Sequence, residues 1–118
     1  MIGININDKY YPFTDLIFSG IKTIETRKTP SLNAYIGMRV GIIRTGKGKA
    51  TLIGFATIGE PIHYKTKEHF RSDEEKHCVT KGSKYDIDDL GKWGNPIINP
   101  IKVKPIYVTS KGIVARKI

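Results

Sequence analysis

Three closely spaced charged side chains, Lys22, Glu25 and Arg27, are the strongest candidates for chemistry in this sequence. They lie in the segment 20–27, which reads Gly-Ile-Lys-Thr-Ile-Glu-Thr-Arg and is predicted to be a helix stop followed by a strand over 22–27. Residues two apart in a strand share a face, so Glu25 and Arg27 are spaced as an ion pair. An acid between two cations suits a charged or polar ligand. The alternative is an exposed edge strand whose charges prevent edge-to-edge pairing.

Strict alternation creates one conflict within this group. It places Lys22 on the face of the apolar Ile24, opposite to Glu25 and Arg27. Lys22 can meet the other two only if a twist or bulge near Gly20 turns it inward. We expect this twist, and we expect the three side chains to line one cleft.

The order of apolar runs, glycines and prolines predicts an α+β fold, a small β-barrel of five or six strands with flanking helices. A short helix is expected between Pro12 and Gly20, and the region 65–92 is expected to be largely helical, with Ser72 and Glu75 as a capping box. The predicted strands are 2–6, 22–27, 38–44, 50–62, 97–108 and 112–117.

Two glycines, Gly54 and Gly59, interrupt the longest apolar run and indicate bulges or sharp coiling. With 118 residues, no repeats and no linker-like stretch, residues 1–118 are predicted to form one domain.

The chain is strongly basic, with 20 Lys and Arg against 11 Asp and Glu, a formal net charge of +9. Such an excess favours polyanions, because binding them releases condensed counterions. The sequence has neither an apolar run long enough to span a membrane nor a convincing basic amphipathic helix. Nucleic acid is therefore the expected partner, and a membrane is not. The N-terminal residues lack the pattern of a signal peptide, and the single cysteine, Cys78, suits a reducing compartment, so a cytoplasmic protein is expected.

Further candidate residues lie in two basic segments. Lys47 and Lys49 occupy a glycine-rich turn over 45–49 that suits phosphate contacts, although a hairpin turn needs no function. Lysines alternate with Ser83, Tyr85 and Trp93 between residues 81 and 95, a pattern suited to stacking unpaired bases, unless the rings close one end of the barrel.

The three histidines, His63, His69 and His77, lack metal-ligand spacing, so neither a metal nor another cofactor is expected. His77 remains a candidate for proton transfer in the cleft.

The segment 20–27 resembles the Gly-x-Lys-x-x-x-x-Arg signature of ASCH domains, which belong to the PUA-like superfamily, and it has the fuller Lys-Thr-x-Glu-x-Arg form. The resemblance continues through Tyr35-Ile36-Gly37-Met38-Arg39-Val40 and the strand 50–60, and it fades after Tyr64. It implies a PUA-like barrel whose cleft, holding the signature, binds RNA or a modified nucleoside. The candidate ligand-binding residues are Lys22, Thr23, Glu25, Arg27, Arg39, Lys47, Lys49, His77, Ser83, Tyr85 and Trp93.

The resemblance also implies an alternative, a hydrolase similar to N4-acetylcytidine amidohydrolases or to ribonucleases, with Lys22 and Glu25 as catalytic residues. In the deacetylase pattern a threonine follows the lysine by three positions and a distant glutamate completes the set. Here Glu25 stands at that position, and the distant acid would be Glu60, Glu74 or Glu75. A third possibility is a regulatory protein that binds another protein, for which the sequence carries no positive signal. Nothing in the sequence indicates an oligomeric state.

Overall fold

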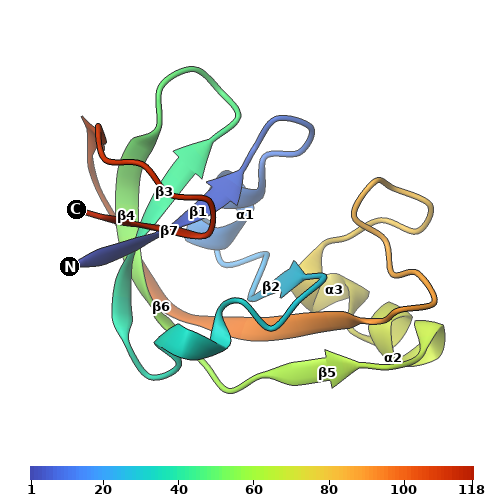
Figure 1. Cartoon of the computed structure of the whole chain (residues 1–118). Helices are drawn as coiled ribbons and strands as arrows, with labels where there is room; N and C mark the ends of the chain where they lie inside the picture. Colours follow the sequence, from blue (N-terminus) through green and yellow to red (C-terminus); the bar gives the residue numbers. More distant parts are fainter.

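Seven strands form one curled, mixed sheet in the computed structural model, which describes all residues from 1 to 118 (Figure 1). The strand order is β2-β6-β4-β3-β1-β7, and β5 also pairs with β6. Only β1 and β3 pair in parallel; the other pairs are antiparallel. The strands are β1 (Ile2–Asn7), β2 (Ile24–Arg27), β3 (Arg39–Thr45), β4 (Thr51–Ile58), β5 (Ile62–Tyr64), β6 (Lys92–Tyr107) and β7 (Ala115–Lys117).

Three short α-helices and one 3₁₀ turn accompany the sheet, which confirms the predicted α+β barrel-like fold. They are α1 (Phe13–Phe18), α2 (Lys67–Ser72), α3 (Glu74–His77) and η1 (Asn33–Tyr35). None of the helices is long and apolar enough to cross a membrane.

The main core lies between the curled sheet and α1. Ile4 and Ile6 of β1 are almost fully buried there, against Phe13 and Ile17 of α1. Because side chains alternate along a strand, Asn5 and Asn7 of β1 point away from this core. A second, smaller cluster under α2 and α3 contains Tyr64, Phe70, Val79 and Ile87.

The predicted irregularity of the long apolar run is confirmed at Gly54. The register of β4 against β6 shifts on both sides of Gly54, between Leu52 and Gly54 and between Phe55 and Thr57. A Cβ at Gly54 would lie 2.4 Å from the ring of Phe18, so only glycine lets α1 approach the sheet at this point. The run ends at Ile58, before Gly59, and its last predicted residue, Ile62, begins the separate strand β5.

The region 65–92 differs from its prediction. Only α2 and α3 are helical, and the segment 78–91 has no regular element. The capping box is wrong: Thr66 caps α2 through its side chain, whereas Ser72 is the last residue of α2 and its hydroxyl donates to the carbonyl of His69. β6 begins at Lys92, five residues before the predicted strand, because its first residues pair with both β2 and β5.

Strands β1 and β2 do not pair with each other. They face one another across an opening in the curled sheet, with β2 joined only to β6 and β1 only to β3 and β7 (Figure 1). The polar side of β1 is turned toward this opening.

Candidate functional site

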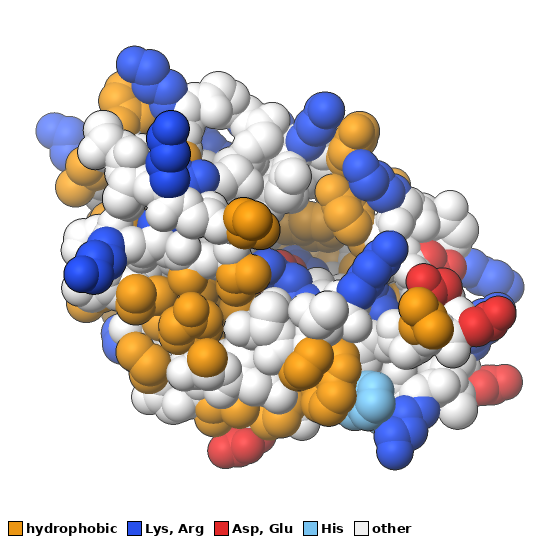
Figure 2. Space-filling model, viewed as in Figure 1, with side chains coloured by type: hydrophobic (Ala, Val, Ile, Leu, Met, Phe, Trp, Pro, Cys, Tyr) orange, Lys and Arg blue, Asp and Glu red, His pale blue; other side chains and the backbone are white.

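A pocket of about 470 Å³ lies in the opening between β1 and β2. Figure 2, viewed as in Figure 1, shows a hollow near the middle of the molecule, with basic side chains inside it and along its rim. The volume lies within the roughly 300–1,000 Å³ typical of small-molecule sites. Five cationic side chains and one carboxylate line it. The lining residues are Asn5, Asn7, Phe13, Lys22, Glu25, Thr26, Arg27, Lys28, Thr45, Val79, Tyr85, Lys92, Gly112, Ile113 and Arg116.

The end of α1 turns Lys22 into this pocket. Gly20 follows the helix with a φ of +82°, in the left-handed region that favours glycine. The backbone N–H groups of Ile21 and Lys22 both donate to the carbonyl of Leu16, so they still belong to the helix end. β2 begins only at Ile24, and the alternation of the strand therefore does not apply to Lys22. The predicted conflict over its direction does not arise.

Lys22, Glu25 and Arg27 form one connected ionic group. Lys22 Nζ lies 3.6 Å from Glu25 Oε1, and Arg27 donates from Nε to Glu25 Oε2 at 3.0 Å. Lys22 is 2 % exposed and Glu25 7 %. Lys22 Nζ also donates to the carbonyl of His77 and lies 4.6 Å from the ring centre of Phe13. A buried carboxylate and a buried amine each need such partners.

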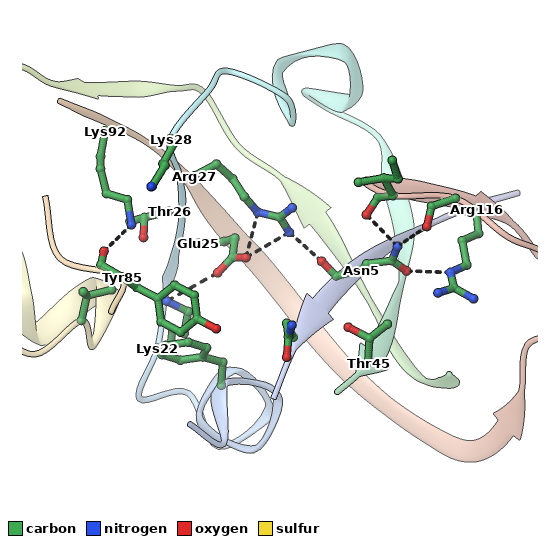
Figure 3. Close-up of a pocket in the computed structure, with 15 residues that line it drawn as sticks. Asn5, Lys22, Glu25, Thr26, Arg27, Lys28, Thr45, Tyr85, Lys92 and Arg116 are labelled. Atoms are coloured by element: carbon green, nitrogen blue, oxygen red, sulfur yellow. Dashed lines mark hydrogen bonds and ion pairs between the residues drawn. The ribbon is translucent and has the colours of Figure 1, made fainter. Parts of the chain in front are cut away.

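Arg27 extends this group across the opening to β1. Its Nη2 donates to the carbonyl of Asn5 at 2.6 Å, and Figure 3 shows the Arg27 side chain lying between Glu25 and Asn5. The Asn5 amide in turn donates to the carbonyls of Gly112 and Ile113, each at 2.9 Å, and its Oδ1 accepts from Arg116 at 3.0 Å. One chain of hydrogen bonds thus joins the signature strand to the C-terminal segment.

The opposite wall of the pocket combines Lys92 with aromatic rings. Lys92 Nζ donates to the carbonyl of Tyr85, and the rings of Phe13 and Tyr85 lie 5.7 Å apart, edge to face. Burial lowers the pKa of the Lys92 amine to about 8, against the opposing attraction of Glu25. Burial also lowers the pKa of Lys22, and the Glu25 carboxylate counteracts part of that effect. Both amines are therefore closer to neutrality than ordinary surface lysines.

Four of the sequence candidates line the pocket: Lys22, Glu25, Arg27 and Tyr85. Thr23 is exposed and outside it. Lys47 and Lys49 are exposed in the β3–β4 turn, and Lys49 lies over the ring of Tyr107.

Three further candidates also lie outside the pocket. Arg39 donates to the carbonyl of Asn99 at 2.7 Å. Trp93 stacks on His63 with ring centres 3.9 Å apart. Ser83 lies in the 78–91 segment, where its hydroxyl is buried without a hydrogen-bond partner.

His77, which also lies outside the pocket, is a buried structural residue. Its Nε2 bonds to the carbonyl of Phe70, its Nδ1 accepts from the N–H of Val79, and its ring stacks on Phe70 at 4.0 Å. Burial lowers the pKa of His77, which favours the neutral ring.

The candidates for a distant acid do not reach the pocket. Glu60, Glu74 and Glu75 are exposed and line no part of it. Glu25 is the one acidic residue that does.

Sequence reasoning missed Asn5, Lys28 and Arg116 as pocket residues, and it pointed to Lys92 only as one lysine of the basic segment 81–95. Asn5 carried a signal, because two asparagines alternate with isoleucines in β1 and a buried asparagine needs partners. Lys28 follows the signature directly. Arg116 carried no local signal, since it reaches the pocket through pairing between β1 and β7, 111 residues from Asn5.

Replacing Glu25 by glutamine should strongly destabilise the protein. The buried Lys22 amine would lose its carboxylate, and breaking a buried ion pair from one side costs about 3–5 kcal/mol. Asp89→Asn is the control, because Asp89 and Lys67 form an exposed pair whose loss should cost less than about 1 kcal/mol. Denaturant unfolding measures both. Equal free energies of unfolding for the two variants would contradict the role assigned to Glu25.

Solved structures share this fold, among them three of one protein. The chain matches a crystal structure of ASCH from Zymomonas mobilis with a TM-score of 0.68 and 19% identity, over 91% of this chain and 73% of that one. A serine-to-alanine mutant of that protein matches with a TM-score of 0.67 and 20% identity, over 90% and 72% of the two chains. A tyrosine-to-phenylalanine mutant matches with a TM-score of 0.66 and 20% identity, over 91% and 75%.

No protein-family model and no curated protein matches the sequence, so the comparison rests on the fold. The structural neighbours of this chain are ASCH domain proteins, and the chain has the fold of an ASCH domain.

Proposed function

We propose that this protein binds RNA and that the pocket between β1 and β2 receives one unpaired nucleotide. The observation that carries the proposal is the gathering of five cations, one carboxylate and two aromatic rings around one cavity. Cations suit a phosphate, ring faces suit a base, and a carboxylate accepts hydrogen bonds from an exocyclic amine. A modified nucleoside is the smaller ligand with the same chemistry.

Four of the five pocket cations already donate to acceptors of the protein, including Lys92 to the carbonyl of Tyr85 and Arg116 to Asn5 Oδ1. Lys22 and Arg27 direct donors to Glu25 and to backbone carbonyls, so their first role is to hold the pocket in shape. Lys28 is exposed on the rim and makes no ion pair with a carboxylate. Lys28 is therefore the cation with most freedom to meet a phosphate.

Glu25 has capacity left for a ligand. Its Oε2 accepts both contacts from Arg27, whereas its Oε1 has only Lys22 at 3.6 Å. A carboxylate oxygen with a long, single contact is a suitable acceptor for the amino group of cytosine or adenine.

Lys28 and Lys47 provide a matched test, since both are exposed lysines but only Lys28 lines the pocket. For a short single-stranded RNA, log affinity should fall linearly with log salt, and Lys28→Ala should reduce the steepness by about 0.7, the value for one phosphate contact. Lys47→Ala should leave affinity and slope near those of the unchanged protein. Fluorescence anisotropy at several salt concentrations measures both. Equal effects of the two substitutions would show that RNA contacts the basic surface in general and not the pocket.

Binding should also weaken as the pH rises from 7 to 9. With a pKa of about 8, the Lys92 amine is mostly charged at pH 7 and mostly neutral at pH 9. Its protonated fraction falls roughly tenfold over this range, and affinity for an anion should fall by up to about that factor. An oligonucleotide of adenine and cytosine avoids base titration in this range. Lys92→Met should bind more weakly at pH 7 and show a shallower profile, in which any remaining slope comes from Lys22, whose pKa burial also lowers. A pH dependence that persists unchanged in Lys92→Met would contradict this assignment.

A second candidate function is hydrolysis of an acetylated cytidine or of the RNA chain. The observation that favours it is the Lys22 amine, whose pKa burial lowers beside Glu25 inside the pocket. In its neutral form such an amine accepts a proton from an attacking water. Incubation with N4-acetylcytidine and with single-stranded RNA, followed by product analysis, tests it. Turnover that Lys22→Met abolishes and Lys47→Met retains supports catalysis; binding without product leaves the RNA-binding proposal as the function.

A further inference from the structure

An exposed tyrosine stands between two lysines beside the pocket. Tyr10 is 52 % exposed in the connection between β1 and α1. Lys84 Nζ lies 4.3 Å from the centre of its ring and Lys9 Nζ lies 5.3 Å from it. Lys84 belongs to the 78–91 segment, so this contact joins two loops that are far apart in the sequence. The three residues form a compact group, referred to below as the Tyr10 cluster.

The positive charge of the Tyr10 cluster is not neutralised by the protein. Neither lysine belongs to an ion pair. Their charges, Lys84 first, lower the pKa of the Tyr10 phenol. Asp8, two residues before Tyr10, is buried and accepts from the N–H and the hydroxyl of Thr14, and it forms no ion pair with either lysine. Two lysines without an ion pair, held on one exposed ring, suit an anionic ligand.

Lys84 and a group of packed aromatic rings connect the Tyr10 cluster to the pocket. Lys84 Nζ also lies 6.0 Å from the ring of Tyr85, and Tyr85 packs edge to face against Tyr11 and Phe13 at 6.0 and 5.7 Å. Tyr85 and Phe13 line the pocket. Asn7, another lining residue, accepts from the N–H of Lys9 through its Oδ1. The Tyr10 cluster therefore lies directly next to residues that line the pocket.

Packing does not account for the position of the Tyr10 ring. The ring belongs to neither buried cluster of the protein, and half of the residue is open to solvent. The neighbouring Tyr11, by contrast, packs against the main core. An exposed ring with lysines around it matches the stacking platforms that bind single-stranded nucleic acid.

We propose that Tyr10, Lys9 and Lys84 form a second nucleotide subsite, so that the ligand is a single RNA strand of at least two nucleotides rather than a free nucleoside. This rests on the proposed function of the pocket. The base next to the one in the pocket stacks on Tyr10, while the two flexible ammonium groups turn from the ring to the phosphate that joins the two nucleotides.

The test compares adenosine monophosphate with a hexa-adenylate on the full chain. The unchanged protein should bind the hexamer more tightly than the monophosphate. Tyr10→Ala should weaken hexamer binding about fivefold or more, the effect of losing one stacked base, and leave the monophosphate unaffected. Tyr10→Phe should retain hexamer binding because it keeps the ring. Tyr107→Ala is the matched control: Tyr107 is 69 % exposed and has Lys49 5.3 Å from its ring, but it lies outside the pocket.

The outcomes separate the two proposals. If the hexamer binds and Tyr10→Ala matches the unchanged protein, the second subsite is wrong and the pocket stands. A loss that is equal for both ligands, or equal in Tyr107→Ala, also overturns the subsite. Failure of both ligands to bind the unchanged protein overturns the proposed function together with the subsite. Equal melting temperatures of the variants show that any loss does not come from unfolding.

Discussion

The Glu25 carboxylate is held out of water between two cations, and the arrangement of the pocket depends on this contact. Burying a carboxylate is costly unless charges and hydrogen bonds replace its water. Lys22 and Arg27 supply the charges, and each is attached elsewhere: Lys22 to the carbonyl of His77 and Arg27 to the carbonyl of Asn5. One acid thereby connects β2 to α3 on one side and to β1 on the other.

This connection explains why an opening in the sheet persists as a pocket. β1 and β2 are not paired as strands, and the Arg27 side chain spans the distance instead. Asn5 continues the link to the carbonyls of Gly112 and Ile113, which places the C-terminal segment along the pocket. Polar side chains thus take the place of strand pairing, and they leave space that apolar packing would fill.

Local sequence patterns were sufficient to predict part of the candidate site. Alternation in the signature strand predicted the Glu25–Arg27 pair, and the glycines of the longest apolar run predicted the bulge at Gly54. The direction of Lys22 was not predictable from alternation, because the end of α1 holds residues 21 and 22 outside the strand. Trp93 was expected to stack on a base or to close one end of the barrel, and in the structure its ring stacks on His63, a partner brought close by the register of β5 against β6. Lys92 and Arg116 reach the pocket only through pairing between distant strands, which no local pattern encodes.

The most direct test of a nucleotide site at the opening between β1 and β2 is to follow backbone amide resonances by NMR while a short single-stranded RNA is added at physiological salt. The account predicts that the shifts concentrate at Asn5, residues 25–28 and Tyr85, which surround the pocket. The turn over 46–49, equally basic but outside the pocket, should remain unchanged. Shifts centred on that turn, or spread evenly over all basic surfaces, would contradict a site in the pocket. They would indicate that RNA binds this protein only through its overall positive charge.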